Sequence, residues 1–447
     1  MAPDWNKVEN ETVARLQTLL RFDTTNPPGN EMPLAVYLQK ELEGAGIETV
    51  LLEPAPTRAA LVARLRGTGN KRPVILLAHM DVVGVERDKW SCDPFAGELR
   101  DGYVYGRGAI DDKGMLAANL TAMLELSALV RETGKLLERD VLFVATSDEE
   151  AGGDWGMGWI IEHHPELVDA EFALNEGGRT RIVGGGKTYL AVQSAEKVSH
   201  VVSVTAAGPA GHAAVPLTDN AIFRLARAVA RMADHVEPLQ LTTITRRFFG
   251  DLAEIWPDPA EGAAMRALVA NDPKLRDEGA AKLSKTAVFN AVLRNGISAT
   301  MLTGGIRYNV IPATAGAAFN VRTLPGESVD DVVSRLRTTI GDSGIDIQVT
   351  QRGEEAPASD PDSEMFAAIA ESVRAIRPEI AVVPYLSTGV TDSARLRRIG
   401  VKAFGILPFP MEQADEERMH GHDERVPVES LHFGTRLIYE ATLRVAT

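Results

Sequence analysis

The chain has 447 residues, more than one hydrophobic core usually holds, so we expect two or three domains. Hydrophobic residues make up 45% and charged residues 24%, which is typical of globular proteins and excludes the disordered and fibrous classes. The net charge of -15 argues against nucleic acid or an anionic membrane as a partner, because both require a basic face.

The sequence also bears on where the protein works. Residues 1–20 mix charges throughout and lack a basic start followed by an apolar stretch, and no later run approaches the ~18 apolar residues of a membrane helix. Cys92 is the only cysteine, which excludes an internal disulfide and a cysteine-based structural zinc site. We therefore expect a cytoplasmic protein with no membrane partner.

The first part of the chain alternates short apolar runs with segments of helical period, which predicts an α/β sheet covered by helices. The predicted strands are residues 60–65, 73–78, 141–146 and 172–174, and the main predicted helix is 113–130. Acidic and imidazole side chains follow three of these strands: His79 and Asp81, then Glu149 and Glu150, then Glu176. Ligands collect at the carboxyl ends of strands in such sheets, so these side chains predict one shared site.

Around residue 193 the pattern changes to that of a second, smaller α+β domain. Its predicted strands are 199–205, 300–308 and 317–322, with a mostly helical segment at 246–298 to which we assign no function. The acidic stretch 354–364 predicts a linker, after which a helix at 365–377 and a strand at 402–407 indicate a return to the first domain. The predicted division is therefore 1–193, 194–355 and 356–447.

Two imidazoles and three carboxylates form a set that could hold two divalent ions. Hydrolysis of an amide at neutral pH needs a strong nucleophile and a polarised carbonyl, and two ions about 3.5–4 Å apart supply both. A carboxylate must bridge such ions, and each needs further ligands and an open position for water. The candidate ligands are His79 in LLAHMD, Asp111 in GRGAIDDKG, Glu150 in SDEEAGG, Glu176 in LNEGG and His420 in MHGHDE, with Asp111 as the bridge.

Two further side chains belong to the predicted site. Asp81 lies two residues after His79 and could accept a hydrogen bond from the free imidazole N–H. Glu149 precedes Glu150 and is the candidate general base. Taken singly, these motifs have ordinary explanations as surface pairs, solvated glutamates or an exposed loop, and only their conjunction after predicted strands indicates a metal centre.

Eight segments between residues 77 and 426 together match one known family. They are HMDVV with WSCDPF, DGYVYGRGAIDDKGM, SDEEAGG, NEGG, GPAGHAAVP, RYNVIPATAGAAFNVR, GVTDSARL and MHGHDERV. In these segments the chain resembles the two-zinc metallopeptidases that include aminoacylase, carboxypeptidase S, acetylornithine deacetylase, succinyl-diaminopimelate desuccinylase and the glutamate carboxypeptidases. The resemblance implies a catalytic domain interrupted by a lid that also serves in dimerisation, and hence a homodimer.

The resemblance implies roles for the same site residues. It makes His79, Asp111, Glu150, Glu176 and His420 the ligands of two divalent ions, with Asp111 bridging, Asp81 supporting a ligand and Glu149 acting as base. It also implies a cis peptide bond after Asp111. Zinc suits this mixed ligand set, and cobalt and manganese tolerate it too.

The resemblance extends to the lid and to the substrate. His212 matches a histidine that stabilises the oxyanion of the tetrahedral intermediate, often in the site of the partner subunit. Asn309 and Arg322 match residues that hold substrate, the arginine by its carboxylate, and Gly389 to Thr391 match a loop that receives the same carboxylate through backbone amides. Two alternatives stay open here: His212 capping a turn, and Arg322 in a structural salt bridge.

The last loop contains two histidines, His420 and His422, of which only one should bind metal. The family places its histidine four residues before a glutamate, and counting back from Glu424 selects His420. The ligand role of His422 stays open as the alternative.

The function that the sequence favours is hydrolysis of N-acyl amino acids or short peptides that carry a free carboxylate. NEGG and the contexts GRGAIDDKGM and DEEAGGDWGM resemble aminoacylase and carboxypeptidase S more than the desuccinylases. Deacetylation or desuccinylation in amino-acid biosynthesis is the alternative within the family. A catalytically inactive binding protein of the same fold is the alternative from another class, and the presence of Asp111 and Glu149 argues against it.

Overall fold

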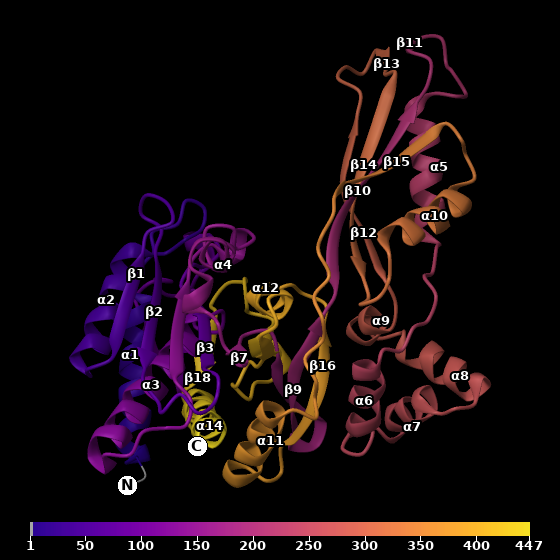
Figure 1. Ribbon diagram of the computed structural model, residues 1–447. Coiled ribbons are helices and arrows are strands. Elements are labelled where there is room, and N and C mark those ends of the chain that lie inside the picture. Colours follow the sequence, from indigo (N-terminus) through magenta and orange to yellow (C-terminus); the bar gives the residue numbers. More distant parts are fainter. Residues whose placement is uncertain (1–2) are drawn as a thin grey trace.

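The computed structural model describes residues 3–447, and its largest element is a mixed sheet of nine strands (Figure 1). The strand order is β1-β2-β6-β3-β7-β17-β9-β16, with β8 paired to β9. The strands are β1 (Glu48–Leu52), β2 (Ala60–Leu65), β6 (Val141–Thr146), β3 (Val74–His79), β7 (Phe172–Asn175), β17 (Lys402–Gly405), β9 (Lys187–Glu196), β16 (Ala381–Ser387) and β8 (Arg179–Val183). Strands β6, β3, β7 and β17 are parallel, so their carboxyl ends meet at one edge.

The central strands of this sheet are buried on both faces, as their uninterrupted apolar sequences predict. Leu76 and Phe143 pack with one layer of helices, while Ile75 and Val144 pack with the other, because successive side chains of a strand point to opposite faces. The first layer is α1 (Trp5–Leu20), α2 (Met32–Gly44), α3 (Lys113–Thr133), α11 (Glu364–Ile376) and α14 (Val428–Ala446); the second is α4 (Met157–His163) and α12 (Asp392–Arg398). This confirms the predicted α/β fold. Across residues 3–447, every helix is too short or too polar to span a lipid bilayer.

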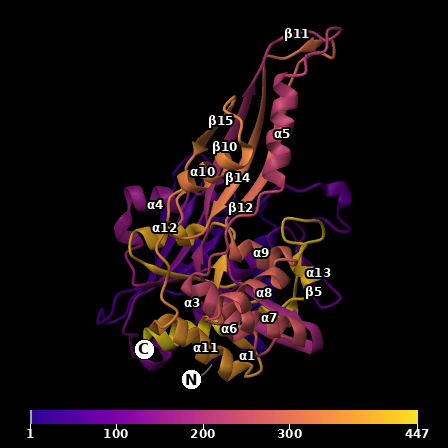
Figure 2. The ribbon, with the colours of Figure 1, turned by 90° about the vertical axis from the view of Figure 1, so that its right-hand side faces the viewer.

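A second, antiparallel sheet stands away from the large one (Figures 1 and 2). Its order is β12 (Gly296–Gly304), β14 (Thr314–Thr323), β10 (Val198–Ala207) and β15 (Ile345–Gln351), and helices α5 (Ala221–Ala233) and α10 (Val329–Ile340) share its core. The pair β11 (Gly211–His212) and β13 (Val310–Ile311) forms its far tip. The strand predicted at 300–308 is wrong in its second half, because the chain turns at Gly305, whose φ is 74°.

The segment predicted to be mostly helical forms four helices. They are α6 (Thr243–Leu252), α7 (Pro259–Val269), α8 (Pro273–Leu283) and α9 (Ala287–Leu293). The side chains of Thr242, Asp258 and Asp272 cap the first three by accepting backbone N–H groups. Although this segment falls within the range predicted for the lid, Phe249 and its neighbours share a core with β9 and β16 of the large sheet. The three-part division stays a prediction, with this segment packed at the edge of the first domain's sheet.

The end of the chain returns to the large sheet and closes against an early loop. Strand β17 pairs with β7 and β9, and the short helix α13 (Gln413–Glu416) follows. Strand β18 (Arg425–Pro427) then pairs with β5 (Tyr103–Tyr105), which pairs with β4 (Glu98–Arg100). This small sheet brings the loop that contains His420 beside the loop that contains Asp111.

A buried ion pair fixes these two loops to each other. Arg107 Nη1 donates to Glu424 Oε2 at 2.5 Å, and Arg107 Nη2 donates to the carbonyl of Gly421 at 2.8 Å. Glu424 also accepts the backbone N–H groups of Gly108, Ile110 and Asp111 at 2.8–3.1 Å. Arg107 is 2% exposed and Glu424 is fully buried, so removing either charge would leave the other without its partner in a low-dielectric interior.

The Arg107→Ala variant is expected to lose about 3–5 kcal/mol of unfolding free energy, the typical cost of breaking a buried pair from one side. Urea unfolding followed by circular dichroism measures this loss. The control is Arg352→Ala, which breaks the exposed pair of Arg352 with Asp330 and should cost less than about 1 kcal/mol. Equal midpoints for the two variants would contradict the assigned role of Arg107.

Candidate metal centre

Three of the predicted ligands lie at the carboxyl ends of neighbouring parallel strands. His79 is the last residue of β3, Glu150 lies in the short turn η2 (Glu149–Ala151) after β6, and Glu176 follows β7. The register pairs His79 with Thr146, the last residue of β6, so the η2 turn begins beside the imidazole. The parallel sheet therefore gathers side chains that are distant in sequence at one edge.

Asp111 lies at the centre of the cluster, between two imidazoles. Its Oδ1 is 2.9 Å from Nε2 of His79, and its Oδ2 is 3.0 Å from Nε2 of His420. The same nitrogen of His420 is 3.1 Å from Glu150 Oε1, and ligand atoms of His79, Asp111 and Glu150 all lie within 4.8 Å of one another. The peptide bond from Asp111 to Asp112 is cis, as the resemblance implies. Each oxygen of Asp111 thus faces a different imidazole, as a bridging carboxylate requires.

The cluster gathers several carboxylates that no lysine or arginine pairs with directly, among residues 3–447. Burial and the nearby Asp111 raise the pKa of Glu176 to about 8, and burial raises the pKa of Glu149 well above its usual range. Hydrogen bonds that the imidazole of His420 donates to the carboxylates of Asp111 and Glu150 raise the pKa of His420 to about 10. Within residues 3–447, no lysine or arginine forms an ion pair with any of these carboxylates.

These residues fit divalent metal ions. Imidazole nitrogens and carboxylate oxygens are ligands that zinc, cobalt and manganese accept, and the convergent carboxylates supply the negative charge that a cation would offset. Both carboxylate oxygens of the adjacent Asp112 are buried without a hydrogen-bond partner, so the excess of acceptors extends beyond the five predicted ligands. The residues could therefore hold metal ions.

Asp81 holds both the first histidine and the η2 turn. His79 Nδ1 is 2.9 Å from the backbone carbonyl of Asp81 and 3.6 Å from its Oδ1, so the carbonyl is the nearer acceptor. The carboxylate oxygens of Asp81 accept the backbone N–H groups of Glu149 and Glu150, each at 3.1 Å. Asp81 is fully buried, and it thereby fixes the positions of three residues of the cluster.

Beneath Asp81 lies a polar network that sequence reasoning missed. Asn26 Nδ2 donates to Asp81 Oδ2 at 2.8 Å, and Arg58 Nη2 donates to Asn26 Oδ1 at 2.7 Å. Arg58 also pairs with Glu31 at 3.0 Å and with Asp148 at 3.2 Å. Asn26, Glu31 and Arg58 belong to no motif and lie far in sequence from Asp148 of the SDEEAGG segment, so only the folded structure shows that they support the site.

The two histidines of the final loop lie in different surroundings. His420 reaches Asp111 and Glu150, whereas His422 Nε2 lies 3.6 Å from Glu86, an exposed glutamate outside the cluster. The pair of Glu424 with Arg107 positions this loop, so the glutamate used to count back to His420 is itself part of the support. The geometry favours His420 over His422 as the ligand.

The lid separates the substrate residues that the resemblance implies. His212 and Asn309 lie together at the tip, where the N–H of Ala213 donates to the carbonyl of Asn309 at 3.1 Å, and His212 is exposed. Figures 1 and 2 both show this tip at the end of the lid farthest from the large sheet. Arg322, on β14, lies at the opposite end of the lid sheet, beside the crossing from β9 to β10. His212 Nδ1 accepts the N–H of Ala214 at 3.0 Å, a contact that agrees with the turn-capping alternative.

The loop from Gly389 to Thr391 lies at that same crossing. Thr391 Oγ1 donates to Glu196 Oε1 at 2.7 Å, and the N–H of Gly389 donates to Ser387 Oγ at 3.1 Å. Glu196 also pairs with the buried Arg397 at 3.1 Å. Glu196 is a further residue that the sequence did not single out, and it connects the end of β9 to this loop.

Comparison with known proteins agrees with this geometry. The model of the peptidase family M20/M25/M40 matches residues 75–444. A Dictyostelium discoideum protein named "Probable carboxypeptidase S-like 2" is 29% identical over 369 residues, which cover 80% of this chain and 69% of that protein. The human N-fatty-acyl-amino acid synthase/hydrolase PM20D1 is 27% identical over 380 residues, which cover 83% of this chain and 73% of that protein.

The fold also matches a solved structure. The crystal structure of the M20 family metallo-carboxypeptidase Sso-CP2 from Sulfolobus solfataricus aligns with a TM-score of 0.71 over 98% of this chain and 99% of that chain, at 19% identity. This likeness covers the large sheet and the lid together. With the family model matching most of the sequence, the chain belongs to the peptidase family M20/M25/M40 and is an enzyme of its metal-dependent, amide-hydrolysing kind.

Proposed function

We propose that the protein is a two-metal hydrolase that cleaves the amide bond of N-acyl amino acids or short peptides with a free carboxylate. The observation that carries the proposal is the Asp111 carboxylate lying between the imidazoles of His79 and His420. Family membership supports the reaction type. The name of one relative states that it acts on N-fatty-acyl amino acids, which supports an acylated amino acid as the substrate.

In this proposal Asp111 would be shared by two divalent ions, and each ion would also take one histidine and one glutamate. His79 and Glu176 would complete the protein ligands of one ion, and Glu150 and His420 those of the other. Zinc, cobalt and manganese all accept these ligands. When bound, the ions would polarise the amide carbonyl and lower the pKa of a water molecule.

Glu149 is the proposed base. Its carboxylate takes a proton from the water that attacks the carbonyl carbon, and it passes a proton to the amine nitrogen as the C–N bond breaks. Asp81 accepts the backbone N–H of Glu149 and so holds the turn that presents it.

Arg322 and the loop from Gly389 to Thr391 are proposed to hold the substrate carboxylate. Arg322 Nη1 is buried without a hydrogen-bond partner, and Nε is the nitrogen that donates to Asn320, at 2.9 Å. A guanidinium with an unsatisfied buried N–H group is suited to a carboxylate. The backbone N–H of Thr391 is 3.4 Å from Glu196 Oε2, a long hydrogen bond that a ligand could replace.

We also propose that the active form is a homodimer in which the lid of one subunit reaches the metal centre of the other. The edge strand β12 and the following turn expose Met301 (64%), Leu302 (69%), Ile306 (92%) and Tyr308 (101%), and exposed apolar side chains on an edge strand favour pairing with another chain. Asn309 is next to this surface, and His212 on β11 is paired with Val310 on β13 in the antiparallel ladder. A partner subunit could therefore receive His212 and Asn309 together.

Chelation is expected to abolish hydrolysis of N-acyl amino acids and dipeptides, and readdition of zinc, cobalt or manganese is expected to restore it. The reason is that the ions would polarise the substrate carbonyl and activate the attacking water. Hydrolysis is measured by release of the free amino acid. The same acyl amino acids with amidated carboxyl groups should react more slowly. Acetylornithine and succinyl-diaminopimelate in the same screen would reveal the alternative specificity.

The two histidines of the last loop provide a matched control for this metal prediction. His420→Ala should lower the bound metal from about two ions to about one per chain, whereas His422→Ala should leave the stoichiometry unchanged, as measured by elemental analysis. Full activity in protein shown to contain no metal would refute the two-metal proposal.

The Glu149→Gln variant is expected to lose a factor of about 10² to 10⁴ in kcat, the usual contribution of a general acid–base, while keeping its metal content. Steady-state kinetics and elemental analysis measure the two effects. Glu162→Gln, on the exposed face of α4, is the control and should keep normal kinetics. A Glu149→Gln enzyme with most of its activity would remove Glu149 from the mechanism.

The dimer proposal predicts complementation between two inactive variants. Glu149→Gln and His212→Ala subunits, mixed in equal amounts after dissociation, should recover about a quarter of wild-type activity. Random pairing makes about half of the dimers mixed, and only one of the two sites in each mixed dimer is complete. Each variant alone, carried through the same dissociation, is the control. No recovery, although mixed dimers are shown by mass spectrometry, would show that His212 does not act across subunits.

A further inference from the structure

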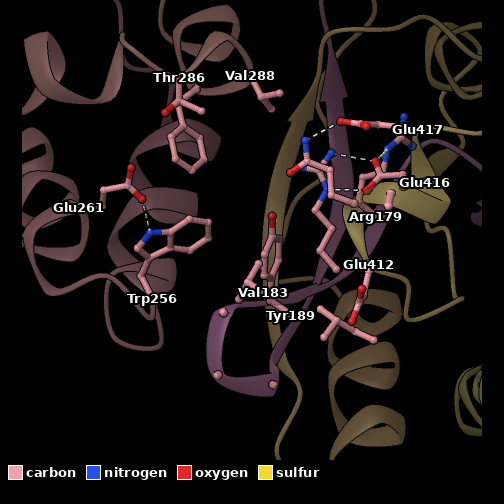
Figure 3. A pocket seen from close by; sticks show the side chains of 18 of the residues that line it. Arg179, Val183, Tyr189, Trp256, Glu261, Thr286, Val288, Glu412, Glu416 and Glu417 are labelled. Atoms are coloured by element: carbon pink, nitrogen blue, oxygen red, sulfur yellow. Dashed lines mark hydrogen bonds and ion pairs between the residues drawn. The ribbon is translucent and has the colours of Figure 1, made fainter.

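A groove of about 930 Å³ lies between the helical segment and the edge of the large sheet (Figure 3). Its helical wall carries Trp256, Val288 and Phe289. Its other wall consists of β8, the start of β9 and α13, and the hairpin at residues 184–186 closes one end. None of the residues assigned to the metal centre lies in it, and the function proposed above does not use it.

The opposite end of the groove borders the segments that carry two proposed ligands. Arg179, at the start of β8, comes three residues after Glu176, and Met419 directly precedes His420. Arg179 Nε pairs with Glu416 Oε1 at 2.7 Å, which joins these two segments at the mouth of the groove. The five residues of β8 then lead away from the site over about 13 Å, at ~3.3 Å per residue.

Aromatic rings form a continuous surface along the groove. The ring centroids of Tyr189 and Trp256 are 6.3 Å apart, and those of Trp256 and Phe289 are 5.5 Å apart. The indole Nε1 of Trp256 donates to Glu261 Oε2 at 2.7 Å, so its polar atom is already satisfied. The rings of Trp256 and Phe289 therefore present apolar surface on the helical wall, beside Glu261 and Thr286.

The charged wall is paired internally. Arg181 makes two bonds to Glu416, at 2.6 and 2.8 Å, and Arg179 pairs with the same carboxylate, whose side chain is 10% exposed. On the rim, Gln413 donates to Glu417 at 2.6 Å. Both arginines are engaged with Glu416, so each guanidinium group already has an acidic partner.

We propose that this groove is the acyl subsite of the enzyme and that it takes an extended apolar acyl chain of medium length. This inference rests on the proposed hydrolysis of N-acyl amino acids. The residues proposed to bind the substrate carboxylate lie at the Glu196 end of β9. The groove lies along the opposite end of the same strand, near Tyr189. The scissile amide at the metal centre thus separates the amino-acid part from the acyl part, and the helices α6 to α9 supply one wall of the acyl subsite.

The length of the acyl chain should control the rate. In a series from acetyl to dodecanoyl on one amino acid, kcat/KM of the wild-type enzyme should rise by about threefold to fourfold per added methylene until the groove is filled. The Val288→Asp variant places a charge in the aromatic wall at a residue that is already 43% exposed, and it should flatten this rise. Leu275→Asp, on the neighbouring helix α8 outside the groove and 45% exposed, is the matched control and should keep the wild-type slope.

A binding measurement separates this inference from the function on which it rests. Calorimetric titration of the metal-free protein with decanoate should show binding that Val288→Asp weakens at least tenfold and Leu275→Asp does not change, whether or not any amide is hydrolysed. Failure of the metal-loaded enzyme to hydrolyse every acyl amino acid would refute the proposed function alone. A flat chain-length profile in the wild type, or a Val288→Asp variant with wild-type slope and decanoate affinity, would overturn the acyl subsite.

Discussion

The position of the Asp111 carboxylate between two imidazoles is the constraint on which the rest of the site depends. Each oxygen of Asp111 faces one histidine, and those histidines come from the end of β3 and from a loop more than 300 residues later in the chain. Holding such side chains around a concentration of negative charge requires rigid support, because the carboxylates repel one another in a buried setting. The supporting interactions are themselves ionic and buried: Asp81 under the η2 turn, and Glu424 with Arg107 behind the two loops.

Two separate groups of supporting residues hold the two sides of the cluster. Asn26, Arg58 and Asp81 fix the side that contains His79 and the glutamates, while Arg107 and Glu424 fix the side that contains His420. The lid adds a different kind of constraint, since its tip lies away from this cluster within the chain. The proposed dimer would bring His212 of one subunit to the cluster of the other, and the turn next to Asn309 exposes apolar side chains.

Much of the fold could be read from the sequence where the pattern of side chains was regular. The strands predicted at residues 60–65 and 141–146 coincide with β2 and β6, because strands buried on both faces give nearly continuous apolar runs, broken in β2 only by Arg64. The sequence predicts that residues 246–298 are mostly helical, but it does not predict which sheet they pack against, because their apolar residues would fit either sheet equally well. The strand predicted at 300–308 ran past Gly305, whose turn becomes fixed only at the tip of the lid.

By itself, the sequence determined the α/β class, the family and the candidate ligand set, because these depend on residue types at fixed spacings along the chain. The tertiary structure decided which of His420 and His422 faces the carboxylates, that the Asp81 backbone carbonyl is the nearer acceptor for His79, and that Glu196 supports the Gly389 loop. It also decided that an aromatic groove lies beside the segments that carry Glu176 and His420. These features arise from contacts between segments far apart in the chain, and no local pattern records which distant segment will be the neighbour.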